Sequence, residues 1–210
     1  MPYCGNLLRA LLLAGLLLLA GPAAASDVEL KNPQLTAADD GYALSADVSI
    51  EFGPRLEEAV AKGVVLYFVA DFELTRPRWY WLDEKVASRS QTLRLSYHAL
   101  TRQYRLSTGA LHQNFAALDD ALRMLSHLHN WQVLDKGVAK AGETYLASLR
   151  LRLDLTQLPK PFQITALANK DWNLDSDWLR WSFVAAEGKA LPAESKSVPA
   201  EGKAVASEAK

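Results

Sequence analysis

Arginines alternate with large aromatic side chains in residues 74–82, which read LTRPRWYWL. Guanidinium and aromatic groups together stack on and pair with anionic or sugar-like ligands, and they also anchor protein partners. The segment from Arg76 to Arg105 contains seven basic residues and two acidic ones. This pattern predicts a basic and aromatic ligand- or partner-binding surface, for which the candidates are Arg76, Arg78, Trp79, Tyr80, Trp81, Arg102 and Arg105.

The two tryptophans of this segment can also be explained by a structural role instead of ligand binding. In an extended chain, Trp79 and Trp81 lie on one face, where they would fill the core of a β-sandwich while the arginines occupy its wet side. We predict that Trp79 and Trp81 are buried in the core. The basic face of the segment is then the candidate functional feature.

His127 and His129 have a spacing that resembles a metal-binding pair. However, an apolar stripe at helical spacing predicts a helix near residues 115–129, capped by Asn114, and residues two apart on a helix point about 200° apart. No carboxylate accompanies the pair at a familiar ligand spacing. We therefore predict neither a metal site nor a cofactor.

Local catalytic motifs are absent from the sequence. It contains no G-x-S-x-G elbow, no H-E-x-x-H and no phosphate-binding glycine loop, so we predict no catalytic residues. One enzymatic alternative stays open, an envelope hydrolase that uses His98 or His112 with an acid from residues 171–177. Turn-forming aspartates are the structural explanation of Asp171, Asp175 and Asp177.

The elements that must position these residues are mainly strands. Apolar and polar residues alternate over 42–50, 70–74, 93–98, 103–106, 145–155 and 179–183, and 64–69 reads as a central strand that is apolar on both faces. A tight turn at residues 99–102 would set Tyr97 opposite Tyr104 and Leu95 opposite Leu106.

These segments predict a mainly β fold, an immunoglobulin-like two-sheet antiparallel β-sandwich with two short helices, near residues 54–62 and 115–129. Gly53-Pro54 opens the first helix, because proline suits the first helical position. The prolines at residues 158–161 predict an extended connection outside the sheets.

The chain ends are compositionally distinct from this domain. Residues 1–25 carry an early positive charge, an apolar run at 10–20 and a closing Ala23-Ala24-Ala25, the layout of a cleavable signal peptide. The run is shorter than the roughly 20 residues of a membrane span, so we predict export to the periplasm and no stable span after cleavage; an uncleaved anchor is the alternative. The only cysteine, Cys4, leaves with this peptide.

Residues 185–205 form three imperfect heptads rich in Ala, Lys, Glu and Pro. Together with residues 206–210 they predict a disordered tail over 185–210. Residues 26–184 remain as a single β-sandwich domain. The chain has 23 basic and 24 acidic residues, a net charge of −1, which argues against a nucleic-acid partner.

Four stretches carry a family resemblance: LTRPRWYWLDEKVA, RLSYHALTRQYRLSTG, LPKPFQITAL and DWNLDSDWLRW. They resemble an uncharacterised proteobacterial family of secreted proteins that is classed as a domain of unknown function. Members are often encoded beside a nitrogen-regulation-type membrane sensor kinase and its response regulator. The resemblance implies an exported accessory role linked to envelope signalling, and it implies no catalytic residues.

Together these observations predict a non-catalytic periplasmic binding or interaction module. The resemblance makes the external segment of an envelope sensor kinase the candidate partner. A cell-wall glycan-binding module that works through an exposed tryptophan face is a further alternative.

Overall fold

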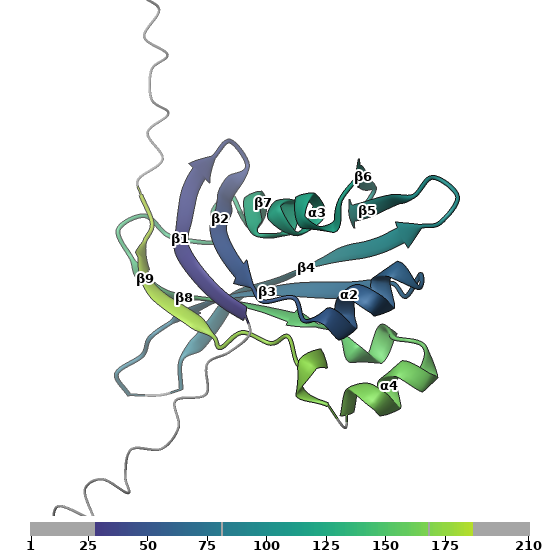
Figure 1. The fold of residues 1–210 in the computed structure, drawn as a ribbon. Helices are drawn as coiled ribbons and strands as arrows, with labels where there is room; N and C mark the ends of the chain where they lie inside the picture. Colours follow the sequence, from purple (N-terminus) through teal and green to yellow (C-terminus); the bar gives the residue numbers. More distant parts are fainter. Residues whose placement is uncertain (1–27, 81, 168, 187–210) are drawn as a thin grey trace, which may run out of the picture.

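The computed structural model describes residues 28–80, 82–167 and 169–186, which form two antiparallel sheets packed face to face (Figure 1). The smaller sheet has the order β1-β2-β7 and the larger has the order β6-β5-β4-β3-β8-β9. The strands are β1 (Val28–Ala38), β2 (Gly41–Ile50), β3 (Leu66–Arg76), β4 (Glu84–His98), β5 (Gln103–Thr108), β6 (Leu111–Phe115), β7 (His127–Asp135), β8 (Thr144–Leu153) and β9 (Leu179–Val184). The predicted two-sheet antiparallel β-sandwich is confirmed. The expected signal peptide and residues 187–210 of the expected tail lie outside the described residues, whereas Ala185, which was assigned to the tail, is buried in the core.

The described helices are short and connect strands. They are α2 (Pro54–Ala61), α3 (Leu118–Leu125) and α4 (Lys160–Leu167), with single 3₁₀ turns at Leu155–Gln157 and Lys170–Trp172. The helix predicted near residues 54–62 is confirmed as α2, which buries Leu56, Ala59 and Val60. The extended connection predicted for residues 158–161 is wrong, because α4 begins at Lys160 and the first turn of a helix accepts a proline.

The core lies between the two sheets and follows the period-two alternation. On β3 the inward-facing residues Leu66, Phe68, Ala70, Phe72 and Leu74 are all fully buried. Each fully buried side chain of this size contributes roughly 1.5–3 kcal/mol relative to an exposed one. The opposite face of the larger sheet carries polar side chains and faces away from the smaller sheet.

The predicted hairpin register is confirmed in β4 and β5. Tyr97 pairs with Tyr104, with ring centroids 4.9 Å apart, and Leu95 pairs with Leu106. This register leaves every second residue of both strands on the outer face of the larger sheet, where it positions the polar site described below.

The helix predicted over residues 115–129 is wrong at both ends. Asn114 lies in β6 instead of capping a helix, and the helix N-cap is Ala117. The chain leaves the helix after Leu125 because residues 127–135 pair with β2 instead, beginning with a 2.7 Å hydrogen bond from the Val48 N–H to the Ser126 carbonyl. Pairing with an existing strand outweighs the helical preference of a short segment.

Strand β2 begins so close to β7 that only glycine fits at position 41. Gly41 has a φ of 141°, and a Cβ there would lie 1.9 Å from the Leu134 carbonyl oxygen. We expect Gly41→Ala to lower the free energy of unfolding by about 2–3 kcal/mol. The matched control is Gly63→Ala, which also has a positive φ but open space around it. Urea denaturation checks both, and equal losses would contradict this explanation.

Candidate functional site

The connection between β3 and β4 carries the most exposed aromatic side chains of the described chain. Trp79 is 95% exposed and Tyr80 is 65% exposed, and Leu82 beside them is 81% exposed. The Trp79 and Tyr80 rings contact each other edge to face, with centroids 5.2 Å apart. We call Trp79, Tyr80 and Leu82 the hairpin tip; Trp81 lies outside the described residues.

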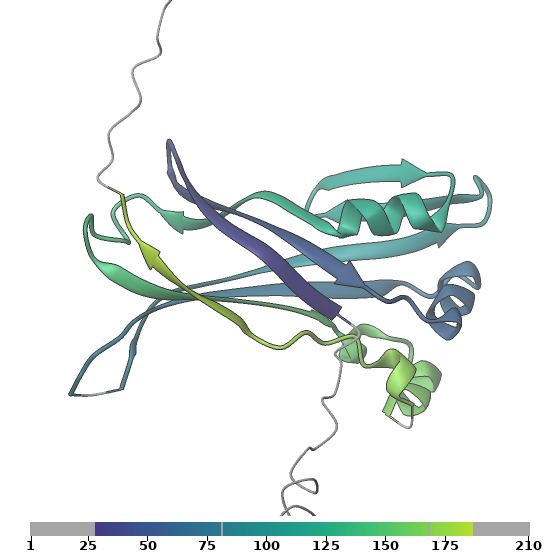
Figure 2. The ribbon, with the colours of Figure 1, turned by 60° about the vertical axis from the view of Figure 1, so that its left-hand side comes forward.

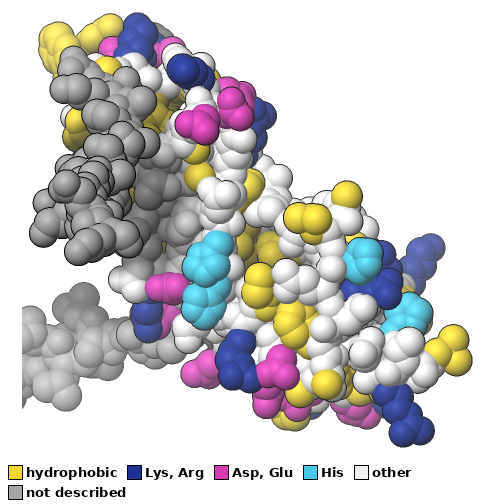
Figure 3. All heavy atoms as spheres, turned by 90° about the horizontal axis from the view of Figure 1, so that it is seen from above, with side chains coloured by type: hydrophobic (Ala, Val, Ile, Leu, Met, Phe, Trp, Pro, Cys, Tyr) yellow, Lys and Arg dark blue, Asp and Glu magenta, His cyan; other side chains and the backbone are white. Residues whose placement is uncertain are grey.

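The hairpin tip stands apart from the rest of the molecule. In Figures 1 and 2 the β3–β4 hairpin extends beyond the body of the sandwich. Figure 3 shows hydrophobic side chains gathered at the same extremity, at the upper left of that view. The expectation that Trp79 fills the core is therefore wrong. β3 ends at Arg76 and Pro77 follows it, so Trp79 belongs to the connection instead of a core-facing strand.

Two arginines form ion pairs at the base of the tip. Arg78 contacts the Glu84 carboxylate, and Arg76 lies 3.0 Å from Glu143 and 3.7 Å from Glu84. The hydroxyl of Tyr145 and the two carboxylates raise the pKa of Arg76 further above its ordinary value. These contacts join β3, β4 and β8 where the hairpin leaves the body, so the tip is held by an ionic network.

Arg102 and Arg105 lie at the opposite end of the larger sheet. The hairpin tip precedes the first residue of β4, and Arg102 follows its last residue. The 15 residues of β4 span roughly 45 Å at about 3.3 Å per residue. The sequence-predicted residues therefore form two groups, with Arg76, Arg78, Trp79 and Tyr80 at one end of the sheet and Arg102 and Arg105 at the other.

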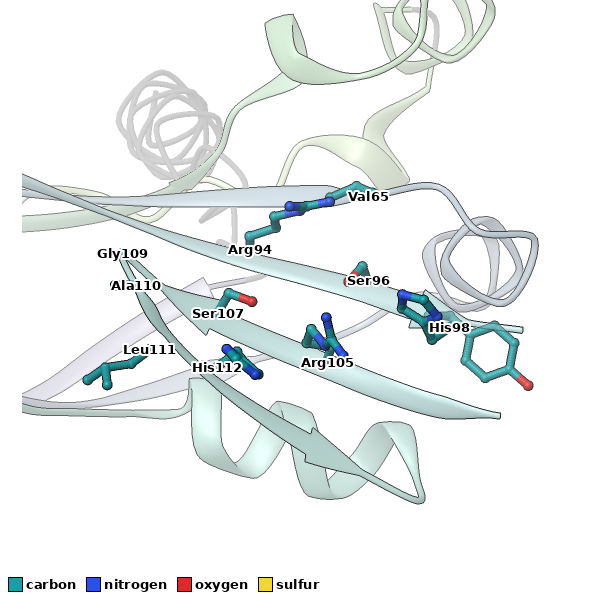
Figure 4. A pocket seen from close by; sticks show the side chains of 11 residues that line it. Val65, Arg94, Ser96, His98, Arg105, Ser107, Gly109, Ala110, Leu111 and His112 are labelled. Carbon is teal, nitrogen blue, oxygen red and sulfur yellow. The ribbon is translucent and has the colours of Figure 1, made fainter. Parts of the chain in front are cut away.

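A polar cavity lies at this second end, on the outer face of β4, β5 and β6. Its volume is about 230 Å³. Figure 4 shows its side chains coming from three adjacent strands, with Arg94 running toward β3 beside Val65. The residues of its wall with polar side chains are Arg94, Ser96, Tyr97, His98, Arg105, Ser107 and His112. Of these only Arg105 was among the predicted binding residues, although Arg94, Ser96 and His98 alternate in the sequence.

His127 and His129 share one face because they lie on a strand and not on a helix. Their ring centroids are 5.5 Å apart. The Nδ1 atom of His127 lies 2.9 Å from the Arg123 carbonyl oxygen, and its Nε2 atom is 3.9 Å from Asp47. The expected opposite orientation is therefore wrong. Even so, the described residues contain no group of three or more His, Cys, Asp or Glu side chains placed to hold a metal ion.

The acids considered for hydrolysis lie elsewhere in the fold. Asp171 forms an ion pair of 3.2 Å with Arg55, and the backbone of Asp175 forms an isolated β-bridge with that of Arg152. No carboxylate lines the cavity that holds His98 and His112. In the described part of the chain, the histidine–acid arrangement that a hydrolase would need is not assembled at this cavity.

Asp71 forms ion pairs with two arginines in the middle of the outer face. Its carboxylate accepts hydrogen bonds from Arg150 at 3.2 Å, Arg152 at 3.1 Å and Ser90 at 2.7 Å. Burial alone would raise the pKa of Asp71, but the hydrogen bonds from Ser90, Arg152 and Arg150 outweigh it and lower the pKa.

The lowered pKa of Asp71 predicts a dependence of stability on pH. The contribution is present above the pKa of the unfolded carboxyl, about 3.9, and is lost as the pH falls through the lower folded-state pKa. We expect Asp71→Asn to lower the free energy of unfolding by about 1–3 kcal/mol at pH 7. The further decrease in the free energy of unfolding below pH ~4 should be smaller in the variant than in the wild type. Urea denaturation between pH 2 and pH 7 measures this, and parallel curves for the variant and the wild type would contradict it.

Comparisons with known proteins place the chain in a family without assigning an activity. A family model described as a domain of unknown function, DUF4390, matches residues 25–182. No curated protein and no solved structure matches the chain. Among the described residues, no helix combines the length and the apolar character needed to cross a membrane.

Proposed function

The chain belongs to the DUF4390 family, a domain of unknown function, and we propose that it is a non-catalytic binding module of the cell envelope. In this proposal the hairpin tip docks onto a partner protein, and the sandwich holds the tip in place. The exposure of Trp79, at 95%, is the single observation that carries the proposal.

Exposed aromatic residues that gather at one projecting tip are typical of an interaction site. Tryptophan, tyrosine and arginine dominate the binding energy of protein interfaces, usually as a few side chains that enter a pocket of the partner. Trp79 and Tyr80 supply such side chains, and Arg76 and Arg78 lie behind them with their carboxylate partners. A tip held by an ionic network also loses less conformational entropy when it binds.

Acidic side chains beside the tip favour a protein over a bilayer surface. Asp83 and Glu84 directly follow Leu82, and the Arg78 N–H donates to the Asp83 carboxylate at 3.4 Å. The cations near the tip are already neutralised by Glu84 and Glu143. An anionic membrane attracts uncompensated cations and repels these carboxylates.

The edge-to-face contact between Trp79 and Tyr80 also bears on glycan binding, because it turns the two rings 73° from one another. They therefore do not form one flat platform for sugar rings, and we favour a protein partner. The expected export and the family resemblance support the external segment of an envelope sensor kinase as that partner.

In-cell photo-crosslinking tests the proposal. A photoreactive benzoylphenylalanine would replace Leu82 in the full chain, and a second strain would carry it at Leu100. Leu100 is the matched control because it is an exposed leucine, 95% accessible, on the β4–β5 turn at the other end of the sheet.

We expect position 82, and not position 100, to form an adduct with an envelope protein that mass spectrometry then identifies. The adduct should disappear when Trp79 and Tyr80 are also replaced by alanine. The proposal is wrong if position 82 crosslinks only to lipid, if it forms no adduct, or if position 100 captures the same protein equally well.

A further inference from the structure

The polar cavity on β4, β5 and β6 lies far from the hairpin tip and has a separate chemistry. From its wall we infer that it is a binding site for a phosphate-type oxyanion, either free or as the headgroup of a lipid. This inference does not depend on the docking role of the tip, because no residue of the tip lines the cavity.

The charge of the cavity wall is the first argument. Two guanidinium groups line it, those of Arg94 and Arg105, and no acidic residue does. Elsewhere on the same face of the sheet, Arg150 and Arg152 share the carboxylate of Asp71. Among the described residues, neither Arg94 nor Arg105 takes part in an ion pair, so the cavity carries uncompensated positive charge.

Hydrogen-bond donors surround this charge. Arg105 uses its Nε atom to donate to the Asn114 amide oxygen at 3.0 Å, which fixes the side chain and leaves its terminal nitrogens for a ligand. Arg94 lies over the Tyr67 ring at 5.9 Å, at the rim beside Val65 (Figure 4). The hydroxyls of Ser96 and Ser107 have no hydrogen-bond partner among the described residues.

The number of donors indicates the class of ligand. Two guanidinium groups, two hydroxyls and the two imidazoles of His98 and His112 exceed what the two oxygens of a carboxylate can accept. A phosphate group presents three or four acceptor oxygens, and arginine pairs with it in a bidentate manner. The volume of about 230 Å³ fits a phosphate or a small headgroup but is below the usual size of a pocket for a larger organic ligand.

The position on a sheet makes the site preorganised. Arg94, Ser96 and His98 are successive outward residues of β4, and the register sets Arg105 opposite Ser96 and Ser107 opposite Arg94. His112 of β6 lies opposite Ser107. Figure 3 shows histidine side chains next to Lys or Arg side chains at this end of the molecule, to the right of that view.

Calorimetric titration with inorganic phosphate tests the inference on the full chain, with acetate as the carboxylate comparison. We expect saturable phosphate binding that is tighter than acetate binding. Arg105→Gln should weaken it about 10-fold or more, because a charge-assisted hydrogen-bonding group is lost. The matched control is Arg102→Gln, which removes the same charge from the neighbouring turn outside the cavity and should leave the affinity within about twofold.

A second titration with vesicles distinguishes the source of the phosphate group. Binding to phosphatidylglycerol vesicles that is lost in Arg105→Gln, without binding of inorganic phosphate, would assign the site to a lipid headgroup, whereas binding of inorganic phosphate assigns it to a free anion. Because Arg102 is exposed and Arg105 is only half-buried, thermal unfolding of both variants should stay close to that of the wild type. The inference is overturned if neither probe binds, if acetate binds as tightly as phosphate, or if Arg102→Gln weakens binding as much as Arg105→Gln.

Discussion

Replacing Trp79 and Tyr80 together by alanine is expected to weaken binding to the partner protein captured from position 82 by about 100-fold or more. Interface side chains of this kind contribute about 2 kcal/mol or more each, and each 1.4 kcal/mol corresponds to about tenfold in affinity. Both side chains are largely exposed in the isolated chain. The free energy of unfolding should therefore change by less than about 0.5 kcal/mol.

The matched control for this double variant is Leu100→Ala, which removes an equally exposed apolar side chain at the other end of the sheet. Surface plasmon resonance with the immobilised partner measures the affinities, and urea denaturation measures the stabilities. If the double variant bound within about threefold of the wild type, the tip would not be the docking element. If it lost stability as well, the aromatic residues would have a structural role.

Replacing Phe72 by alanine is expected to lower the stability of the protein without changing its affinity for the partner. Phe72 is fully buried on β3, and its ring lies 6.4 Å from the ring of Trp181. Phe→Ala in a close-packed core removes apolar contacts and leaves a cavity, which costs about 3–5 kcal/mol. We expect a loss of this size in urea denaturation, with partner affinity unchanged under conditions where the variant is folded.

Tyr80→Ala is the control for the core variant, since it also removes an aromatic ring but from an exposed position. Its free energy of unfolding should stay within about 0.5 kcal/mol of the wild type. A small loss in Phe72→Ala would contradict the placement of the core between the two sheets. A large loss in Tyr80→Ala would contradict the exposure of the tip.

The strands and their faces could be predicted because the period-two pattern is local. In β4 and β5 the alternation of apolar residues set Tyr97 opposite Tyr104, since a one-residue shift would have moved the apolar side chains out of the core. The boundary between α3 and β7 could not be predicted in this way. The apolar residues before His127 fit a helix, and the decisive contact is with β2, about 80 residues earlier in the chain.

The candidate site was predictable only in part, because closeness in sequence differs from closeness in space. Arg78 and Arg105 belong to one basic segment, yet the full length of β4 separates them. The exposure of Trp79 depends on where β3 ends, and residue types alone favour burial of tryptophan. Conversely, the outward alternation of Arg94, Ser96 and His98 was visible in the sequence, but the absence of a neutralising acid was not.

The most direct test of the docking role is co-sedimentation of the purified protein with right-side-out envelope vesicles, before and after protease removes their exposed protein segments. The intact tip and the tip variant are both compared in an Arg105→Gln background, so that a lipid headgroup in the polar cavity does not contribute to sedimentation. We expect the protein with the wild-type tip to sediment with untreated vesicles, protease treatment to abolish this binding, and the variant with Trp79→Ala and Tyr80→Ala to stay in the supernatant. If the protein with the wild-type tip sedimented equally with protease-treated vesicles, or the variant with untreated ones, the docking role would be contradicted.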